Sequence, residues 1–142
     1  MIELNYGSAA LPDQVFVGDF EACRYPKEHF RHADHIRLAW IYLRQHEYPV
    51  AEDRMRRSIH QFARQVGAAH KYHETITIAW MRLVRTASQF SSRIETFEEF
   101  VRAHEWLLNK EAIFEFYSPE RIKSESARTS WVEPDLKPIP TL

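Results

Sequence analysis

Hydrophobic residues recur at helical spacing through the middle of the chain. Between Pro49 and Pro119 there is no proline, and Gly67 is the only glycine, so this stretch has few residues that break helices. The apolar spacing predicts four main helices, over residues 27 or 33 to 46, 50–66, 71–90 and 96–109. Shorter helices are predicted over 111–117 and directly after Ser118, the latter because Ser followed by Pro suits an N-cap and first turn.

Two of these helices carry further local signals. Gly67 stands where the helix over 50–66 needs a C-terminal cap. Thr96 followed by Glu99 forms a capping box at the start of the helix over 96–109. The helix over 71–90 is apolar on nearly every side, which predicts that it is central and largely buried.

Helix-breaking residues gather at both ends of the chain. Residues 1–26 are expected to form an irregular arm, with a short strand pair near Gln14–Val17, and the proline-rich residues 131–142 an extended tail. The predicted fold class is therefore all-α, with four main helices in a bundle-like arrangement and short C-terminal helices. Its length of 142 residues predicts one domain over 1–142.

Net charge and cysteine content indicate which partners and which cellular compartment to expect. The net charge of −1 gives no field that would gather nucleic acid or a membrane surface. Cys23 is the single cysteine, which excludes an internal disulfide and a multi-cysteine zinc site. No basic start with an apolar core and no apolar run of about 18 residues is present, so a cytoplasmic protein without membrane contact is expected.

Histidines offer the most specific chemistry in the sequence. Helical spacing places His32 and His35 on or beside the apolar stripe of one helix and His73 on the flank of another. The segments HIRLAWIYLR and TITIAWMRLVR resemble each other at an offset of 40 residues, which would put Trp40 and Trp80 at the same level. The three histidines would then converge on one divalent transition metal, such as zinc, copper, iron or manganese.

Two carboxylates lie beside these histidines. Asp34 is expected to point away from the apolar stripe, as a first-turn charge favoured by the helix dipole, so Asp34→Asn should be mild. Glu74 belongs to the most buried helix and is the candidate acid or base, or the residue that orients a metal ligand. The alternative for all three histidines is structural, with each buried ring satisfied by neighbouring polar groups.

Aromatic and hydroxyl side chains around the histidines could line a substrate pocket, namely Tyr72, Thr77, Trp40 and Trp80. The three scattered glycines cannot form a phosphate-binding loop, so no nucleotide cofactor is expected.

The segments FRHADHIRLAWIYLR, YHETIT and RTSWVEPDLKP carry a resemblance to known sequences. The chain resembles a family of small uncharacterised bacterial proteins that share the patterns F-x-H-x-D-H and Y-H-E-T. The resemblance covers most of residues 30 to 136 and implies no activity. It implies that the characteristic positions are His32, Asp34, His35, Tyr72, His73 and Glu74.

Two functions follow as hypotheses. The first is a metal-binding helical enzyme that acts on a small organic molecule, with His32, His35 and His73 as ligands and Glu74 as acid or base. The alternative is a non-enzymatic module that binds a small ligand or a protein, in which the histidines are structural and exposed aromatic residues form an interaction or homodimer surface.

Overall fold

The computed structural model describes residues 6–90 and 93–140, and every regular element in these ranges is helical. The predicted all-α fold class is therefore confirmed. The chain divides into two compact units, Met1–Tyr72 and His73–Leu142, and each is described by itself. The single domain and the bundle of four main helices stay predictions. None of the described helices combines the length and apolar character that crossing a bilayer needs.

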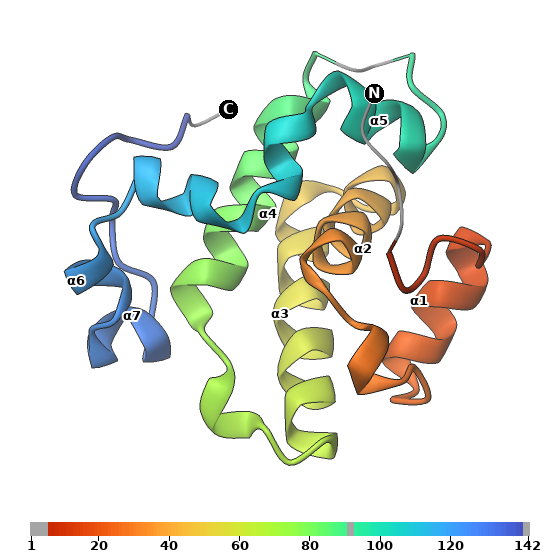
Figure 1. The fold of residues 1–142 in the computed structure, drawn as a ribbon, viewed down its shortest axis with the longest axis horizontal. Helices are drawn as coiled ribbons and strands as arrows, with labels where there is room; N and C mark the ends of the chain where they lie inside the picture. The colour runs from red at the N-terminus through yellow and green to blue at the C-terminus, as the bar shows by residue number, and fades with distance from the viewer. Residues whose placement is uncertain (1–5, 91–92, 141–142) are drawn as a thin grey trace. The chain divides into compact units, whose positions relative to one another are not determined.

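The described residues of unit 1, 6–72, form three α-helices and two short 3-10 turns (Figure 1). The α-helices are α1 (Asp13–Glu21), α2 (His32–Gln45) and α3 (Tyr48–Gln65), and the 3-10 turns are η1 (Lys27–His29) and η2 (Ala69–Lys71). Helix α3 contacts both α1 and α2. The helices predicted over 27 or 33 to 46 and over 50–66 are thus present, with α3 beginning one residue before Pro49.

The predictions for residues 1–26 are wrong where α1 lies. Residues 14–17 are helical and not part of a strand pair, and within residues 6–26 only the segments around α1 are irregular. Val15, Val17 and Gly18 have weak helix propensity, which hid this helix from the sequence pattern. Burial of Phe16 and Phe20, one helical turn apart and both 0% exposed, overrides that weak propensity.

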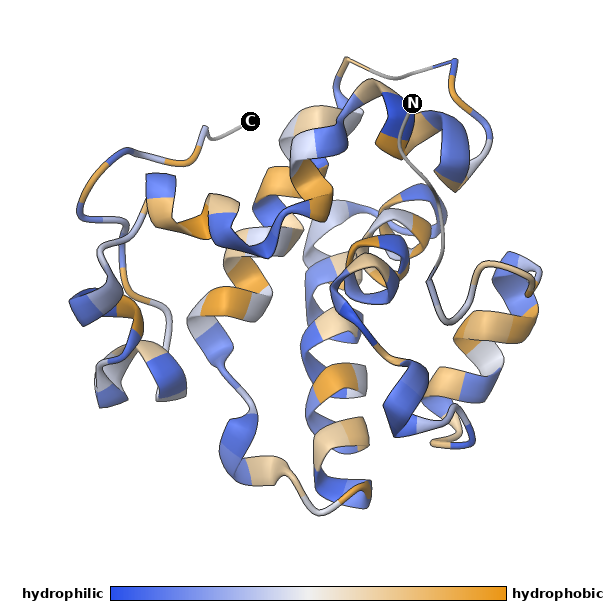
Figure 2. Ribbon diagram, viewed as in Figure 1, coloured by the Kyte–Doolittle hydropathy of each residue, from blue (hydrophilic) through white to orange (hydrophobic). Residues whose placement is uncertain are grey.

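An aromatic cluster forms the centre of unit 1. The Phe20 ring stacks on Phe62 of α3 with centroids 4.5 Å apart, and lies 4.7 Å from the Phe30 ring. Tyr25 meets Phe16 edge-on at 5.2 Å. Figure 2 shows hydrophobic and hydrophilic residues alternating along α3, as expected of a helix with one buried and one exposed face.

Helices α1 and α3 end in the same hydrogen-bonding motif. At the end of α3, Gly67 has φ 74°, and the amides of Gly67 and Ala68 donate to the carbonyls of Arg64 and Ala63. The predicted Gly67 cap is thus confirmed. At the end of α1 the left-handed position is occupied by Cys23, with φ 58°, and not by glycine.

Unit 2 is built on the long helix α4 (Glu74–Ser88), which contacts α7 (Glu125–Thr129) and the 3-10 turn η4 (Lys110–Glu115). Between these lie α5 (Phe97–Ala103), η3 (Glu105–Leu108) and α6 (Pro119–Ile122). The Oγ1 atom of Thr96 accepts from the amide of Glu99, and Oγ of Ser118 accepts from that of Arg121, so both predicted N-caps are confirmed.

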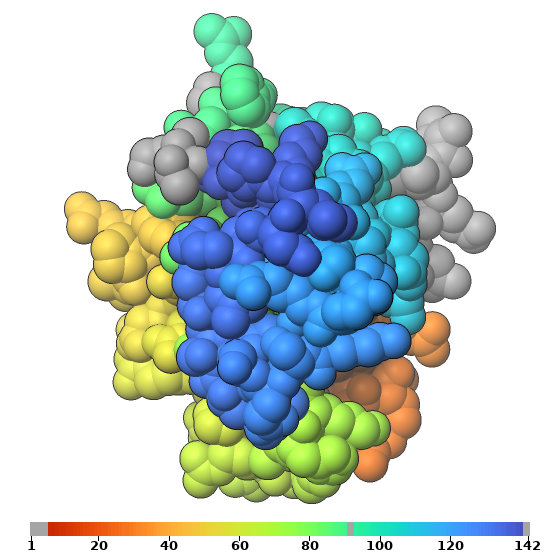
Figure 3. Space-filling model, turned by 90° about the vertical axis from the view of Figure 1, so that its left-hand side faces the viewer, coloured from red at the N-terminus to blue at the C-terminus, as the bar shows by residue number. Residues whose placement is uncertain are grey.

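Two predictions in unit 2 need correction. The helix predicted over 96–109 is interrupted at His104, whose φ of −136° and ψ of 58° are not helical. The helix predicted over 111–117 is the 3-10 turn η4. Residues 131–140 form no helix or strand, and Asp135 holds them by accepting from the Ser118 amide and hydroxyl at 2.8 and 2.6 Å. In Figure 3 this segment, in dark blue, lies against the residues around α6 and α7.

Candidate functional site

His73 uses both ring nitrogens within unit 2. It is the N-cap of α4, and its Nδ1 accepts from the amide of Ile76 at 3.1 Å. Its Nε2 lies 2.7 Å from the carbonyl oxygen of Ile122, which fixes Nε2 as the protonated donor. A neutral ring bonded at both nitrogens has no lone pair left for a metal. His73 thus matches the structural alternative, and its convergence with the histidines of α2 stays a prediction.

His32 and His35 lie one turn apart at the start of α2, with ring centroids 6.5 Å apart. The His35 ring stacks on Phe30 at 6.3 Å, and its Nε2 is buried without a hydrogen-bond partner among the described residues. Residues 6–90 and 93–140 contain no group of three or more His, Cys, Asp or Glu side chains suited to hold a metal ion.

The remaining predicted site residues have identifiable positions. Glu74 is the first residue of α4 and is partly exposed, although most of that helix is buried. Thr77 donates its hydroxyl to the carbonyl of His73 at 2.8 Å, and the Tyr72 ring stacks on His60 at 4.7 Å. Trp40 and Trp80 are buried, each in its own unit. Their assignment as a substrate pocket stays a prediction.

Burial of His35 makes unit 1 sensitive to acid. Burial, and secondarily the charge of His32, lowers the pKa of His35 to about 3 from an ordinary value near 6.5. The unfolded chain therefore takes up the proton first, and stability falls as the pH drops below about 6.5. At pH 5 the expected loss is about 2 kcal/mol relative to pH 7.5, at about 1.4 kcal/mol per pH unit.

Urea unfolding at pH 7.5 and pH 5 measures this loss in the wild type and in His35→Phe, which keeps an aromatic ring next to Phe30. We expect the variant to lose about 2 kcal/mol less between the two pH values. His104, whose pKa is also lowered by burial, is present in both proteins, so the difference isolates His35. The same pH dependence in both proteins would contradict the assignment.

Asp34 is fully buried, which the prediction of a first-turn charge that points away from the apolar stripe did not anticipate. Its Oδ1 accepts from the amide of Ser8 at 2.8 Å, and its Oδ2 accepts from the amide of Arg31 at 3.0 Å. The second bond caps the start of α2. The bond from the Ser8 amide ties the segment before α1 to α2, and that segment covers the Asp34 carboxylate. One side chain therefore fixes two stretches of backbone that are far apart in sequence.

Arg37, one turn further along α2, binds the same segment through its guanidinium. The side chain is buried, and its guanidinium donates to the carbonyls of Ser8 and Leu11 at 2.5 and 2.6 Å and to Oδ1 of Asp13 at 2.8 Å. It also lies 5.1 Å from the centre of the Phe16 ring. Asp34 and Arg37 thus bind successive parts of residues 8–13.

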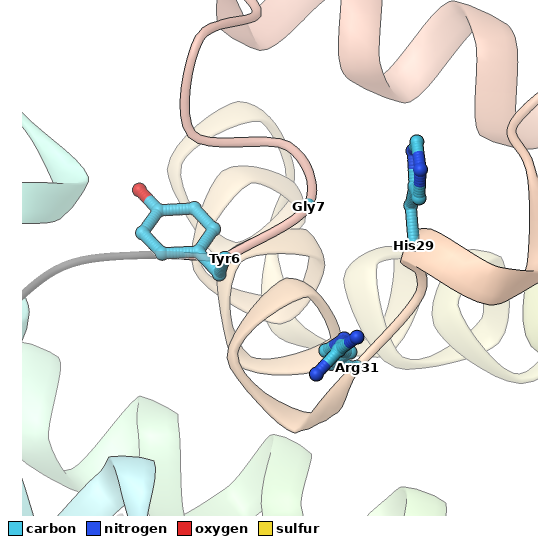
Figure 4. A pocket seen from close by; sticks show the side chains of 4 residues that line it. All are labelled: Tyr6, Gly7, His29 and Arg31. Carbon is cyan, nitrogen blue, oxygen red and sulfur yellow. The ribbon is translucent and has the colours of Figure 1, made fainter.

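A pocket of about 350 Å³ is lined by Tyr6, Gly7, His29 and Arg31. Figure 4 shows Tyr6 and Gly7 on one wall and His29 with Arg31 on the other. Asp34 binds the amide of Arg31 in one wall and the amide of Ser8, which follows Gly7 of the other wall. Because these amides share one buried carboxylate, the spacing of the walls is set before any ligand arrives.

Gly7, which lines this pocket, lies in close contact with His29 and Tyr25. A Cβ atom at Gly7 would overlap the carbonyl oxygen of His29 and lie 2.6 Å from the Tyr25 hydroxyl, so only glycine permits this close approach. Burial, together with the negative charge of Asp34, raises the pKa of Tyr25 to about 12, so the phenol stays protonated at neutral pH.

The sequence patterns did not single out this pocket, because its walls come from segments more than 20 residues apart. One local signal was available: Asp34 stands three residues after Arg31, at the position from which a carboxylate caps a helix start. Comparison of the chain with protein-family models, with curated proteins and with solved structures gave no match, so the site is interpreted from its own geometry.

Proposed function

We propose that this protein is a small-ligand-binding module whose pocket at Tyr6, Gly7, His29 and Arg31 takes an organic anion with a carboxylate or phosphate group. The observation that carries the proposal is the preformed pocket, with an arginine and a histidine on one wall. Its volume of about 350 Å³ falls within the range of small-molecule pockets.

Each lining residue has a chemical role in this proposal. The planar guanidinium of Arg31 can donate two parallel hydrogen bonds to a carboxylate or phosphate. No ion pair of Arg31 occurs within residues 6–90 and 93–140, so its charge is not already neutralised there. His29 adds a ring N–H donor, and Tyr6 offers an aromatic wall for the organic part of the ligand.

Preorganisation supports binding as the function. The Asp34 carboxylate and the Arg37 guanidinium tie residues 8–13, next to Gly7, to α2, so these residues have little conformational entropy to lose on binding. A metal-dependent enzyme has less support, because the ring nitrogens of His73 both bond to the protein.

Titration of the full chain with benzoate and with phenyl phosphate, followed by amide chemical shifts in nuclear magnetic resonance spectra, tests the proposal. Saturable shifts of the Gly7 and Arg31 amides are expected with benzoate, with phenyl phosphate or with both. The ligand that binds more tightly identifies the preferred anion, carboxylate or phosphate. Benzyl alcohol, which has the ring without the charge, should bind more weakly. Arg31→Gln should weaken anion binding about 10-fold or more, since a hydrogen bond to a charged group contributes about 1.5 to 3 kcal/mol.

Arg24→Gln is the matched control, because Arg24 is an exposed arginine of unit 1 that pairs with Asp19 outside the pocket. This variant should change affinity less than twofold. Equal losses in both variants, or shifts that do not saturate at Gly7 and Arg31, would reject the proposed site. Near-stoichiometric zinc, copper, iron or manganese in protein purified without a tag or chelator would instead favour the metal-dependent enzyme.

A further inference from the structure

A second polar groove lies along the exposed face of α3, away from the pocket described above. Its volume is about 310 Å³, and it is lined by Arg57, His60, Gln61, Arg64 and Gln65. All five side chains are exposed, and none is a carboxylate. The opposite face of the helix, with Met55 and Phe62, is buried in unit 1, so the lining residues are not part of its core.

We propose that this groove on α3 binds an acidic peptide segment of a partner protein, in an extended conformation with two carboxylates three residues apart. Arg57 and Arg64 are separated by seven residues, which is about 10.5 Å along an α-helix. In a polyproline II segment, residues i and i+3 lie on the same side and about 9.3 Å apart. The long arginine side chains can accommodate the remaining difference of about 1 Å.

The charge balance in the groove leaves Arg64 as its principal anion-binding side chain. Asp53 lies 2.7 Å from Arg57 and 3.9 Å from Arg56, but such exposed ion pairs are weak, so Arg57 can exchange Asp53 for a peptide carboxylate. For Arg64 no ion pair occurs within the described residues. His60 is held by its stacking on Tyr72 at 4.7 Å, which gives the centre of the groove a fixed wall.

The glutamines favour a peptide over a nucleic acid. Gln61 and Gln65 stand one turn apart, and each amide has both a donor and an acceptor. The backbone of an extended peptide has free N–H and C=O groups that match both. A phosphate backbone has acceptors only, so the amide oxygens would lose water without gaining a partner. The net charge of −1 gives no field that would gather a long polyanion.

Fluorescence anisotropy with a labelled peptide containing Glu-Ala-Pro-Glu between neutral flanks tests this proposal on the full chain. We expect saturable binding that weakens with rising ionic strength, about 10-fold in Arg64→Gln and less than twofold in the exposed control Arg24→Gln. A peptide with both glutamates replaced by glutamine should lose at least as much affinity as Arg64→Gln causes. Circular dichroism of each variant confirms that these surface changes leave the fold intact.

Three results would overturn the proposal: no saturable binding of the Glu-Ala-Pro-Glu peptide, equal weakening in Arg64→Gln and Arg24→Gln, or tighter binding of a single-stranded DNA oligonucleotide of the same charge. The last result would assign the groove to phosphate backbones. Because Arg31→Gln leaves α3 unchanged, that variant should bind the peptide normally. The two proposed sites can therefore fail independently.

Discussion

Replacement of Asp34 by Ala is expected to lower the free energy of unfolding by about 3 kcal/mol. The change leaves the amides of Ser8 and Arg31 without their acceptor, and a buried donor without a partner costs about 1 to 3 kcal/mol. The bond to the Arg31 amide is also the cap of α2, and loss of such a cap by itself costs about 1 kcal/mol. Asp34→Asn keeps one acceptor oxygen but turns an NH2 group toward the other amide, so about half of the loss should remain.

Urea unfolding followed by far-ultraviolet circular dichroism measures this loss. Asp53→Ala is the control, because Asp53 is a half-exposed carboxylate whose ion pairs lie on the surface of α3. Exposed pairs contribute about 0.2 to 1 kcal/mol, so the control should lose less than about 1 kcal/mol. A loss that small in Asp34→Ala would show that the carboxylate does not hold the two segments together.

Arg37→Met is expected to cost a similar amount, about 3 kcal/mol, although methionine preserves much of the side-chain volume. The substitution removes three hydrogen bonds to Ser8, Leu11 and Asp13 and leaves two of their carbonyl oxygens without the guanidinium. Arg37→Lys keeps the charge but lacks the planar fork that reaches several acceptors, so it should recover only part of the loss.

Hydrogen exchange locates the effect of Arg37→Met. Amides of α1 should exchange faster in the variant, because the segment that leads into α1 is no longer held to α2. Arg44→Met is the control, since Arg44 is an exposed arginine on the same helix that lies over the Trp40 ring. Unchanged exchange in α1 of the Arg37 variant would mean that other contacts hold this segment.

The long helices could be predicted from the sequence because their apolar spacing is strong. Helices α2, α3 and α4 lie within or close to their predicted ranges, and the caps at Gly67, Thr96 and Ser118 follow local rules. Helix α1 could not be predicted in this way, since its stability comes from the packing of Phe16 and Phe20 and not from the propensity of its residues.

Helical spacing did not predict the site because His73 and Asp34 lie at the starts of their helices. His73 precedes α4, and its φ of −129° and ψ of 109° are those of an extended residue. Helical spacing therefore does not give the direction of its side chain. Asp34 is the third residue of α2 and is buried because the segment of Ser8 to Leu11 covers it. Contacts between segments so distant in sequence leave no local pattern.

The backbone at Cys23 has a practical consequence for spectroscopy. Cys23 is the single cysteine of the chain and has the left-handed conformation that glycine adopts without steric cost. Exchange of this residue for glycine therefore provides a thiol-free background with an intact end of α1. A fluorophore or spin label attached through a new cysteine elsewhere would then report on one chosen position alone.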